Sequence, residues 1–360
     1  MSYDITSGLR LRLIDFDSQP WDSDINENFR LIGSWYDGTA SPALLGYKNV
    51  VVNGSFNIWQ RGTVFTATTG ITWTADRWGT YFSGTPSNTT VTQKSTLSDG
   101  IGTLLALGCL YYAEIKTTTV GTETLKQYFT NIENVHIFSN STVTLSFVAW
   151  SPDGAQLGVV LQQVFGTGGS PSAVVTTSQQ FVTLTSTPTL YTMTFSLAST
   201  VGKTLGSNNN DRLAITFLLT VGANTYNISA VTLEKGTVAS GLPFLPQATE
   251  LLHCMRYYET SFVGAPTGFT AGLGAAYGFD HFSGFCYRAV KFAVPKRKAP
   301  TVTLYDAIGT SNRVSIYNGT TWVDNINPVV VTLPQQFSLV HTTAGSIATE
   351  FGFTALSEVI

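Results

Sequence analysis

The side chains best suited to recognising a ligand are aromatic rings set among neutral polar residues. Phe, Trp and Tyr make up 12% of the 360 residues, whereas charged residues make up only 11%. A flat ring offers apolar area with a polar edge, so it can lie against the C–H face of a pyranose while neighbouring Asn, Asp or Thr side chains hydrogen-bond the hydroxyls. We expect Trp73 and Tyr81, which lie beside Thr and Gly, to be surface rings, and Trp78 and Phe56 to lie in the core.

Catalytic motifs are incomplete in this sequence. Gly202-Lys203-Thr204 resembles the end of a phosphate-binding loop, but Leu197 occupies the position of its first glycine. Neither a G-x-S-x-G nor an H-E-x-x-H sequence occurs, and the four histidines are scattered along the chain. Carboxylates that could form a glycosidase pair lie close in sequence only where we expect no cleft, at Asp15, Asp17, Asp22 and Asp24. We therefore expect a protein that is not an enzyme.

The cysteines and histidines match no disulfide or metal-binding pattern. Three cysteines, Cys109, Cys254 and Cys286, cannot all pair within the chain, and none belongs to a C-x-x-C sequence. His253 beside Cys254, and His281 five positions before Cys286, are more often packed or surface side chains than metal ligands. We expect reduced, buried cysteines, no metal site and no cofactor.

The charge balance argues against nucleic-acid and membrane partners. Nineteen Lys and Arg against 22 Asp and Glu give a net charge of -3, and the longest basic stretch is Lys296-Arg297-Lys298. The most apolar window, 101–115, is interrupted by Thr103 and Gly108 and is shorter than the roughly 18 residues of a membrane span. We expect no nucleic-acid binding and no membrane insertion. The first 12 residues lack a secretory signal, so an exported protein would need another route, such as release by lysis.

The elements that must position the rings follow a β pattern between residues 49 and 244. Short runs of β-branched and aromatic residues are separated by Gly, Pro, Asn and Asp turn signals. In Thr142–Trp150 apolar and polar residues alternate, as in a half-buried antiparallel strand. Many such strands without a long helix between them predict a β-sandwich or jelly roll. The predicted strands include 50–53, 143–150, 157–165, 190–197, 213–221 and 228–233.

Two helices are predicted outside this β pattern. In the first 47 residues, Asp24 and Glu27 form a capping pair, and apolar residues recur at helical spacing at Ile25, Phe29, Ile32 and Tyr36. A helix this short is unstable alone, so its apolar face must pack against the chain or against a partner. After Pro243 and Pro246, a second helical pattern predicts a linking helix over 248–259.

A second β unit is predicted to follow the linking helix. Its expected strands are 285–294, 301–305, 313–317, 329–333 and 347–353, and the Gly- and aromatic-rich stretch 264–284 is predicted to be a loop. The predicted fold class is mainly β. It comprises a short N-terminal attachment segment with a helix (1–47), an antiparallel β-sandwich or jelly roll (48–245), and a linking helix with a second β-sandwich-like tip domain (246–360).

Three passages together resemble the tail-fibre and receptor-binding proteins of tailed bacteriophages. The first, NGSFNIWQRGT at 53–63 followed by TADRW at 74–78, looks like the opening of that family's carbohydrate-binding-module-like jelly roll. The second, VTLEKG at 231–236 with Pro243-Phe244 and ELLHCMRYY at 250–258, is similar to the passage that closes the jelly roll and leads into a helix. The third, residues 292–294 and KRKAPTVT at 296–303, resembles the family's strand, basic turn and Pro-Thr-Val strand.

The resemblance implies a non-enzymatic virion protein, usually a homotrimer. Its N-terminus would be fixed to other phage tail, collar or baseplate proteins, and its β domains would face host cell-surface polysaccharide. Three identical sites would convert a weak glycan affinity into useful avidity. Such a protein is made in the host cytoplasm and released by lysis. The resemblance implies no cofactor, but it leaves open a structural Ca²⁺ held by loop carboxylates.

The resemblance also assigns roles to residues of this chain. Virion attachment would use the apolar residues Leu11, Leu13, Phe16, Trp21, Ile25, Phe29 and Ile32. Glycan contacts are expected at Trp73 and Tyr81, and at the exposed tip loop through Tyr277, Phe279, Asp280 and His281. The Asn-Gly-Ser-Phe and Asp-Arg-Trp sequences look structural, with Arg77 bridging a carboxylate such as Asp76 while Trp78 fills the core.

Two other classes of function stay open at this point. A purely structural collar, baseplate or adaptor protein would bind only virion proteins through residues 1–47 and would have no affinity for host cells. A polysaccharide-degrading tailspike would release reducing ends from host capsule or lipopolysaccharide. The chain has no coiled-coil or β-helical shaft pattern, which leaves open a short fibre, a collar or baseplate decoration, or an adaptor under another fibre.

Overall fold

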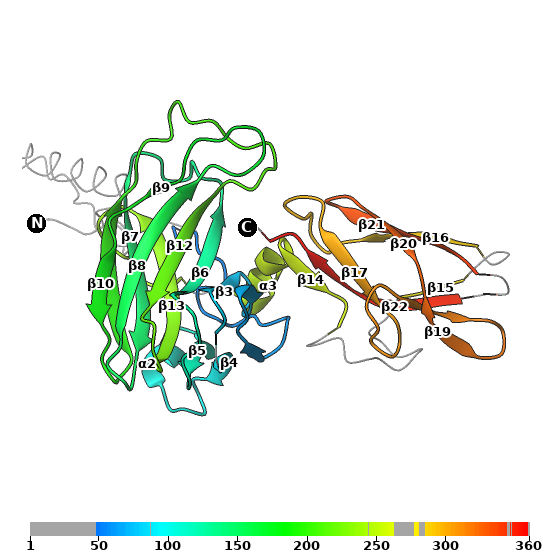
Figure 1. The fold of residues 1–360 in the computed structure, drawn as a ribbon, viewed down its shortest axis with the longest axis horizontal. Helices are drawn as coiled ribbons and strands as arrows, with labels where there is room; N and C mark the ends of the chain where they lie inside the picture. Colours follow the sequence, from blue (N-terminus) through cyan, green and yellow to red (C-terminus); the bar gives the residue numbers. More distant parts are fainter. Residues whose placement is uncertain are drawn as a thin grey trace, which may run out of the picture.

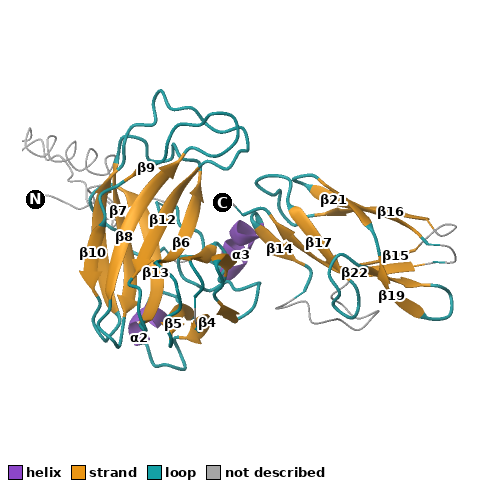
Figure 2. Ribbon diagram, viewed as in Figure 1, coloured by secondary structure: helices purple, strands orange, loops and turns teal. Residues whose placement is uncertain are grey.

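The protein consists of two successive β units. The computed structural model describes residues 48–86, 88–243, 245–262, 277–280, 285–343, 346 and 348–358. The first unit runs from Val64 to Lys235, the second from Tyr258 to Leu356, and helix α3 (Gln247–Met255) lies between them, as Figures 1 and 2 show. The mainly β fold class is confirmed. All predicted attachment residues lie outside the described residues: Leu11, Leu13, Phe16, Trp21, Ile25, Phe29 and Ile32.

Two antiparallel sheets face each other in the first unit. The first sheet contains, in spatial order, β1 (Val64–Thr66), β4 (Thr89–Ser95), β5 (Tyr111–Thr117), β13 (Thr225–Lys235), β7 (Thr142–Trp150) and β11 (Thr189–Ser196). The second sheet contains β10 (Gln180–Thr183), β8 (Gln156–Val164), β12 (Arg212–Leu219), β6 (Leu125–Glu133), β3 (Trp78–Ser83) and β2 (Gly70–Trp73), with β9 (Val175–Thr176) paired to β8. Strands distant in sequence are neighbours in both sheets, which is the crossover pattern of a jelly roll.

Aromatic rings fill the space between these two sheets. The Trp78 ring centroid lies 4.7 Å from that of Phe56, 5.4 Å from Tyr128 and 6.2 Å from Phe217. All four side chains are buried. Since side chains alternate along a strand, the residues between these core positions on β3, β6 and β12 must face outward. The predicted core positions of Trp78 and Phe56 are confirmed.

The predicted strand at 50–53 is wrong, because residues 52–55 form a turn. Asn53 adopts a φ of 56° there. Its side-chain oxygen accepts the Ile58 N–H at 3.0 Å, and its amide donates to the carbonyls of Ile58 and Asp76, each at 2.9 Å. A short polar side chain that bonds nearby backbone groups favours a left-handed turn over an extended strand.

Strand β7 is not half-buried as its alternation predicts. Every residue of β7 after the first is buried. Its inner face lies in the core between the two sheets, and its outer face is covered by α2 (Gly102–Ala106) and the chain that follows. Leu104 and Tyr112 pack against Val148 and Trp150 on this outer face. Alternation identified the strand correctly, but only tertiary packing decided that both faces are covered.

The second unit contains a larger and a smaller sheet. In the larger one, β22 (Ala348–Leu356) pairs with β14 (Tyr258–Thr260), β15 (Tyr277–Asp280), β17 (Thr301–Tyr305) and β18 (Val314–Tyr317), and β18 pairs with β19 (Trp322–Ile326). The smaller sheet has the order β16 (Phe285–Lys291), β21 (Gln336–Thr342), β20 (Val329–Thr332). Phe337 lies between them, with its ring centroid 5.8 Å from Phe292 and 5.1 Å from Phe353.

Two boundaries in this unit differ from the prediction. Helix α3 ends at Met255 rather than at residue 259, because Tyr258–Thr260 form β14 and pair with β22. The predicted loop over 264–284 contains strand β15, which also pairs with β22. Hydrogen bonding to a strand about 70 or more positions later overrides the local helix and loop signals. The rest of 264–284 lies outside the described residues.

All three cysteines are free and buried, as predicted. Burial raises the pKa of Cys109 to about 11, so its thiol stays protonated at neutral pH. Within the residues described, no helix is long and apolar enough to cross a membrane.

Buried ion pairs join the two units. Arg77 adopts a φ of 71°, and its side chain leaves the turn before β3 to donate to the Glu358 carboxylate and to the Asn131 carbonyl. Its guanidinium carbon lies 3.5 Å from the centre of the Tyr257 ring. The predicted bridge from Arg77 to a carboxylate is present, but its partner is Glu358 rather than the adjacent Asp76. The left-handed backbone at Arg77 directs its side chain away from the preceding residue and toward the second unit.

Asp76 instead pairs with Arg61. Arg61 donates to Asp76 at 3.0 Å and to Glu358 at 3.1 Å, and its guanidinium lies over the Tyr258 ring at 3.8 Å. Burial raises the pKa of Asp76 to about 6, although Arg61 and Gln60 oppose the rise. Three residues of the passages that resemble the phage family thus bond groups beyond the first unit: Ser55 donates to Glu250 of α3 at 2.8 Å, and Arg61 and Arg77 donate to Glu358.

Candidate functional site

A groove of about 260 Å³ lies on the outward face of the second sheet, opposite the core. Its lining comes from β2, β3, β6, β12 and β8, which are consecutive neighbours in that sheet. Neighbouring strands lie about 4.8 Å apart, so the groove extends roughly 19 Å across the strands. This width accommodates an extended chain-like ligand.

The strand register places the lining side chains in rows across the sheet. Tyr81 of β3 is paired with Gln127 of β6. Four positions further along β6, after the outward residue Phe129, Asn131 is paired with Ala214 of β12, and Ala214 is in turn paired with Gln162 of β8. Because alternate residues of a strand face the same side, all of these side chains project outward.

Aromatic rings gather at one end of the groove. Tyr81 is 37% exposed and lies opposite Ile71 of β2. Phe129 lies in the floor, and its ring meets the Trp73 ring edge-on with centroids 5.5 Å apart. Gly79 makes room for this contact, since an added Cβ would lie 3.1 Å from the Trp73 ring and 3.3 Å from that of Phe129. The two predicted surface rings thus share one face, and Tyr81 lines the groove.

Neutral polar groups line the middle of the groove. They are the amides of Gln127, Asn131 and Gln162 and the hydroxyl of Thr216. A primary amide offers both donors and an acceptor, so it can bond a hydroxyl group in either direction. An exposed ring beside several amides on an open sheet face can therefore bind a ligand that has a flat apolar face and a rim of hydroxyls.

The predicted tip residues do not join this groove. Tyr277, Phe279 and Asp280 lie on β15, which is paired with β22 of the second unit. Figure 1 shows β15 at the end of the second unit that lies away from β3. His281 lies outside the described residues. The role of these residues in recognition stays a prediction.

Most of the groove's polar residues were missed from the sequence. The segment Leu125–Glu133 was not among the predicted strands, although it forms β6 at the centre of the groove. The sequence signal was weak, because neither face of this strand is uniformly polar or apolar: Lys126 and Thr130 lie on the buried face with Tyr128, and Phe129 lies on the outward face with Gln127. Only the register across five strands shows that these amides share a surface with Tyr81.

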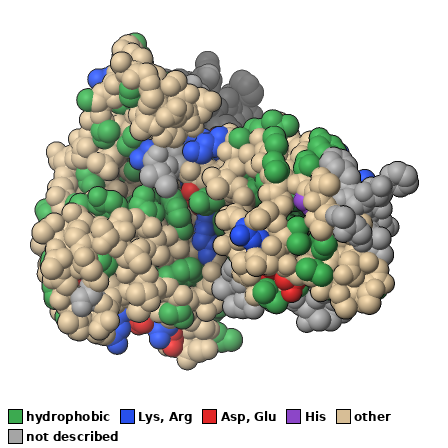
Figure 3. Space-filling view, turned by 45° about the vertical axis from the view of Figure 1, so that its right-hand side comes forward, with side chains coloured by type: hydrophobic (Ala, Val, Ile, Leu, Met, Phe, Trp, Pro, Cys, Tyr) green, Lys and Arg blue, Asp and Glu red, His purple; other side chains and the backbone are tan. Residues whose placement is uncertain are grey.

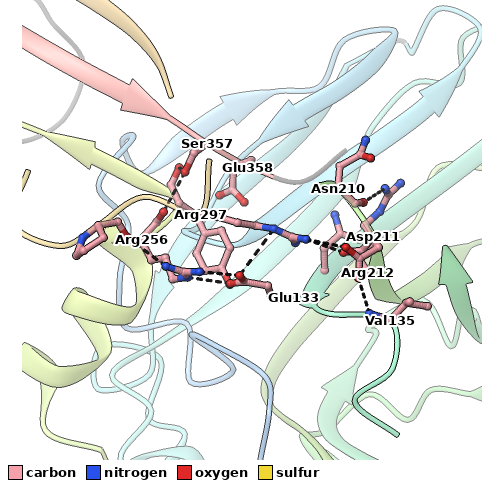
Figure 4. Close-up of polar contacts among 12 residues, drawn as sticks. Glu133, Val135, Asn210, Asp211, Arg212, Arg256, Arg297, Ser357 and Glu358 are labelled. Carbon is pink, nitrogen blue, oxygen red and sulfur yellow. Dashed lines mark hydrogen bonds and ion pairs between the residues drawn. The ribbon is translucent and has the colours of Figure 1, made fainter. Parts of the chain in front are cut away.

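A cluster of ion pairs lies beside the groove where the two units meet, as Figure 4 shows. Glu133 accepts hydrogen bonds from Arg256 at 2.6 and 2.8 Å and from the Tyr257 hydroxyl at 2.7 Å. Arg297 donates to the Asp211 carbonyl at 2.9 Å and to its carboxylate at 3.3 Å. Burial acts to raise the pKa of Glu133, but the hydrogen bonds from Arg256 and Tyr257 and the charges of Arg256 and Arg297 lower it to about 2.

We expect Glu133→Gln to lower the melting temperature at pH 7 by roughly 1–2 °C, the shift produced by a loss of about 1 kcal/mol in a chain of 360 residues. A carboxylate whose pKa is lower in the folded state stabilises the fold above its unfolded pKa and loses this effect as the pH falls. The difference between wild type and variant should therefore shrink as the pH falls from about 4.5 toward 2. Thermal unfolding followed by circular dichroism measures it. A difference that stays constant down to pH 3 would contradict the prediction.

Charged side chains are few on the face of the molecule drawn in Figure 3, where neutral polar groups and scattered apolar side chains predominate. In the ranges that the structure describes, no three His, Cys, Asp or Glu side chains are grouped so that they could hold a metal ion. The groove of the second sheet is the candidate site because it combines an exposed ring with several neutral polar side chains.

Comparison with solved structures finds only weakly similar chains. The enzymatically active domain of tailspike protein 4 from bacteriophage CBA120 is 14% identical over 54% of this chain, which spans 22% of that domain, with a TM-score of 0.34. A CBM4 chain is 20% identical over 51% of this chain and 98% of its own length, with a TM-score of 0.30. A sugar-binding protein from Bacteroides thetaiotaomicron, described as putative, is 14% identical over 52% of this chain and 100% of its own, with a TM-score of 0.34.

The identities and TM-scores are too low to carry an argument on function. No family model matches the sequence, and no curated protein matches it either.

Proposed function

We propose that this protein binds glycans through the groove of the second sheet, and that it does so as a tail-fibre or receptor-binding protein of a bacteriophage particle. The observation that carries glycan binding is the exposed Tyr81 ring on the same open sheet face as the half-buried amides of Gln127 and Gln162. Rings stack on the C–H face of a sugar, and amides hydrogen-bond its hydroxyls. The low charge of the chain fits a polar, uncharged binding surface.

The place in a virion is supported by the three sequence passages that resemble phage tail-fibre proteins. As in that family, we propose a homotrimer that is attached to the particle through residues 1–47 and does not cleave the glycan. Several apolar side chains on the β units are exposed to water in a single copy of the chain. Contacts between copies in a trimer would cover such side chains. Examples are Val64, Leu190, Val201, Val329 and Val331.

Tyr81→Ala is expected to weaken binding of a host-envelope glycan at least about tenfold, the effect of losing roughly 1.4 kcal/mol of ring contact. The binding partner is first identified on an array of bacterial surface polysaccharides, and affinities are then measured by calorimetry. Tyr287→Ala is the matched control, because Tyr287 is also exposed but lies on β16 of the second unit. Equal affinities for wild type and Tyr81→Ala would remove the groove from the proposal.

The virion part of the proposal is tested with the full chain. We expect the native mass of a trimer, and we expect the purified protein to block adsorption of the phage that encodes it to its host. A monomer would contradict the trimer. Absence of any affinity for host cells would favour a purely structural collar or adaptor protein, and release of reducing ends from the bound polysaccharide would show a degrading tailspike instead.

A further inference from the structure

One lining residue of the groove differs in charge from all the others. Arg212 of β12 lies at the end near Val164, whereas every other side chain that lines the groove is uncharged. The amides and the tyrosine can bond neutral and acidic sugars alike. Any discrimination by charge in this groove therefore depends on Arg212.

The Arg212 guanidinium lacks an acidic partner among the residues the structure describes. Its single hydrogen bond runs from Nη1 to the Asn210 carbonyl at 3.2 Å, and its Nε is buried without an acceptor. The adjacent Asp211 carboxylate does not compensate it. That carboxylate accepts from the Val135 N–H at 3.0 Å and from Arg297 at 3.3 Å, as Figure 4 shows.

The charges around Arg212 leave an excess of one positive charge. Arg256 and Arg297 are paired with the carboxylates of Glu133 and Asp211, and Arg212 is the third guanidinium of the cluster. Burial and the nearby Arg297 lower the pKa of Arg212, which means that its surroundings disfavour the cation. An anion bound at this end of the groove would relieve that effect.

We infer that the groove binds an acidic oligosaccharide, with the carboxylate of a uronic acid placed against the Arg212 guanidinium. This inference rests on the proposed glycan-binding function and names the class of glycan. A guanidinium presents two parallel N–H groups that match both oxygens of a carboxylate, and a single positive charge matches a singly charged sugar acid. Val164 and Ala214 beside it are apolar, so the interaction is screened less than in open water.

The test compares sugars that differ only in the carboxylate. Oligosaccharides of β-1,4-glucuronan, β-1,4-mannuronan and polygalacturonate are each titrated against the full-length protein beside their carboxyl-reduced forms, in which CH₂OH replaces COO⁻. We expect at least one acidic member to bind about tenfold more tightly than its reduced form. Its affinity should fall between low salt and about 0.15 M salt, because the Debye length shortens to about 8 Å, while the affinity of the reduced form should change little.

Substitutions assign this preference to Arg212. We expect Arg212→Gln to reduce the tenfold ratio of affinities, acidic over carboxyl-reduced oligosaccharide, to about one. We expect Arg212→Lys to leave an intermediate ratio, because lysine keeps the charge but loses the planar pair of donors. Arg313→Gln, in the second unit, is the matched control and should keep the full ratio. If Arg212→Gln does not fold, the wild-type protein provides the test: its ratio of affinities, acidic over reduced form, should fall as the salt concentration rises, and a ratio that does not change with salt would contradict the inference.

Two outcomes separate this inference from the proposed function. If acidic and reduced forms bind equally, or if only neutral glycans bind on the array, acidic-sugar recognition is wrong while glycan binding stands. If no glycan binds in any arm, the proposed function fails, and the inference fails with it.

Discussion

Replacing Glu358 with Gln is expected to destabilise the protein by about 3–5 kcal/mol, the loss found when one partner of a buried ion pair is removed. The side chains of Arg77 and Glu358 are 2% and 0% exposed. Arg61 also bonds Glu358, so this substitution leaves the buried Arg77 guanidinium without a carboxylate partner and leaves Arg61 with Asp76 alone. The uncompensated charge, rather than the lost contact alone, makes the effect large.

Urea unfolding of the full chain measures this effect. Glu114→Gln is the matched control, because Glu114 pairs with Lys94 at 3.8 Å on a partly exposed surface and should change stability by less than about 1 kcal/mol. Arg77→Met combined with Glu358→Leu removes both charges and should recover part of the loss. A Glu358→Gln variant as stable as Glu114→Gln would show that the Arg77–Glu358 pair does not hold the two units together.

The second large effect is expected from Gly54→Ala, which should cost at least about 4 kcal/mol or prevent folding. A Cβ at residue 54 would lie 2.0 Å from the carbonyl oxygen of Val231 and 3.1 Å from its carbonyl carbon. These are backbone atoms of β13, and the Val231 N–H also donates to the Gly54 carbonyl at 2.9 Å. Relief of the overlap would therefore require displacing a central strand of the first sheet.

Gly102→Ala serves as the control for this substitution. Gly102 begins α2, and an added Cβ there would meet no atom within 4 Å. Since alanine has the higher helix propensity, this change should be neutral or stabilise the protein by up to about 1 kcal/mol. Soluble yield and urea unfolding compare the two variants. Comparable stability of both would mean that Gly54 does not approach β13 as closely as described.

The boundary between the units also supports the candidate site. Arg77 donates to the carbonyl of Asn131, whose side chain lines the groove. Arg297 holds Asp211, which directly precedes Arg212. Loss of the second unit would therefore remove the Arg297 contact to Asp211 and the Glu358 carboxylate that bonds Arg77 beside Asn131.

The β pattern of this protein is determined locally, and the sequence alone predicts it. Alternation of apolar and polar residues located β7 and β12, and runs of β-branched and aromatic residues between turn signals located β8 and β11. The burial of Trp78 and Phe56 and the three reduced cysteines followed from residue type. The early end of α3 was not predicted from the sequence, because residues 258–260, which follow the helix, pair with β22 about 100 positions later.

The binding surface and the ion-pair partners were decided only by the tertiary structure. The groove combines side chains from β2 to β12, between residues 71 and 216. The local sequence of a strand does not determine which other strands become its neighbours in the sheet. Arg77 pairs with a carboxylate 281 positions away rather than with the adjacent Asp76. An ion pair depends on distance in space and on burial, and both follow from the packing of the two units rather than from spacing along the chain.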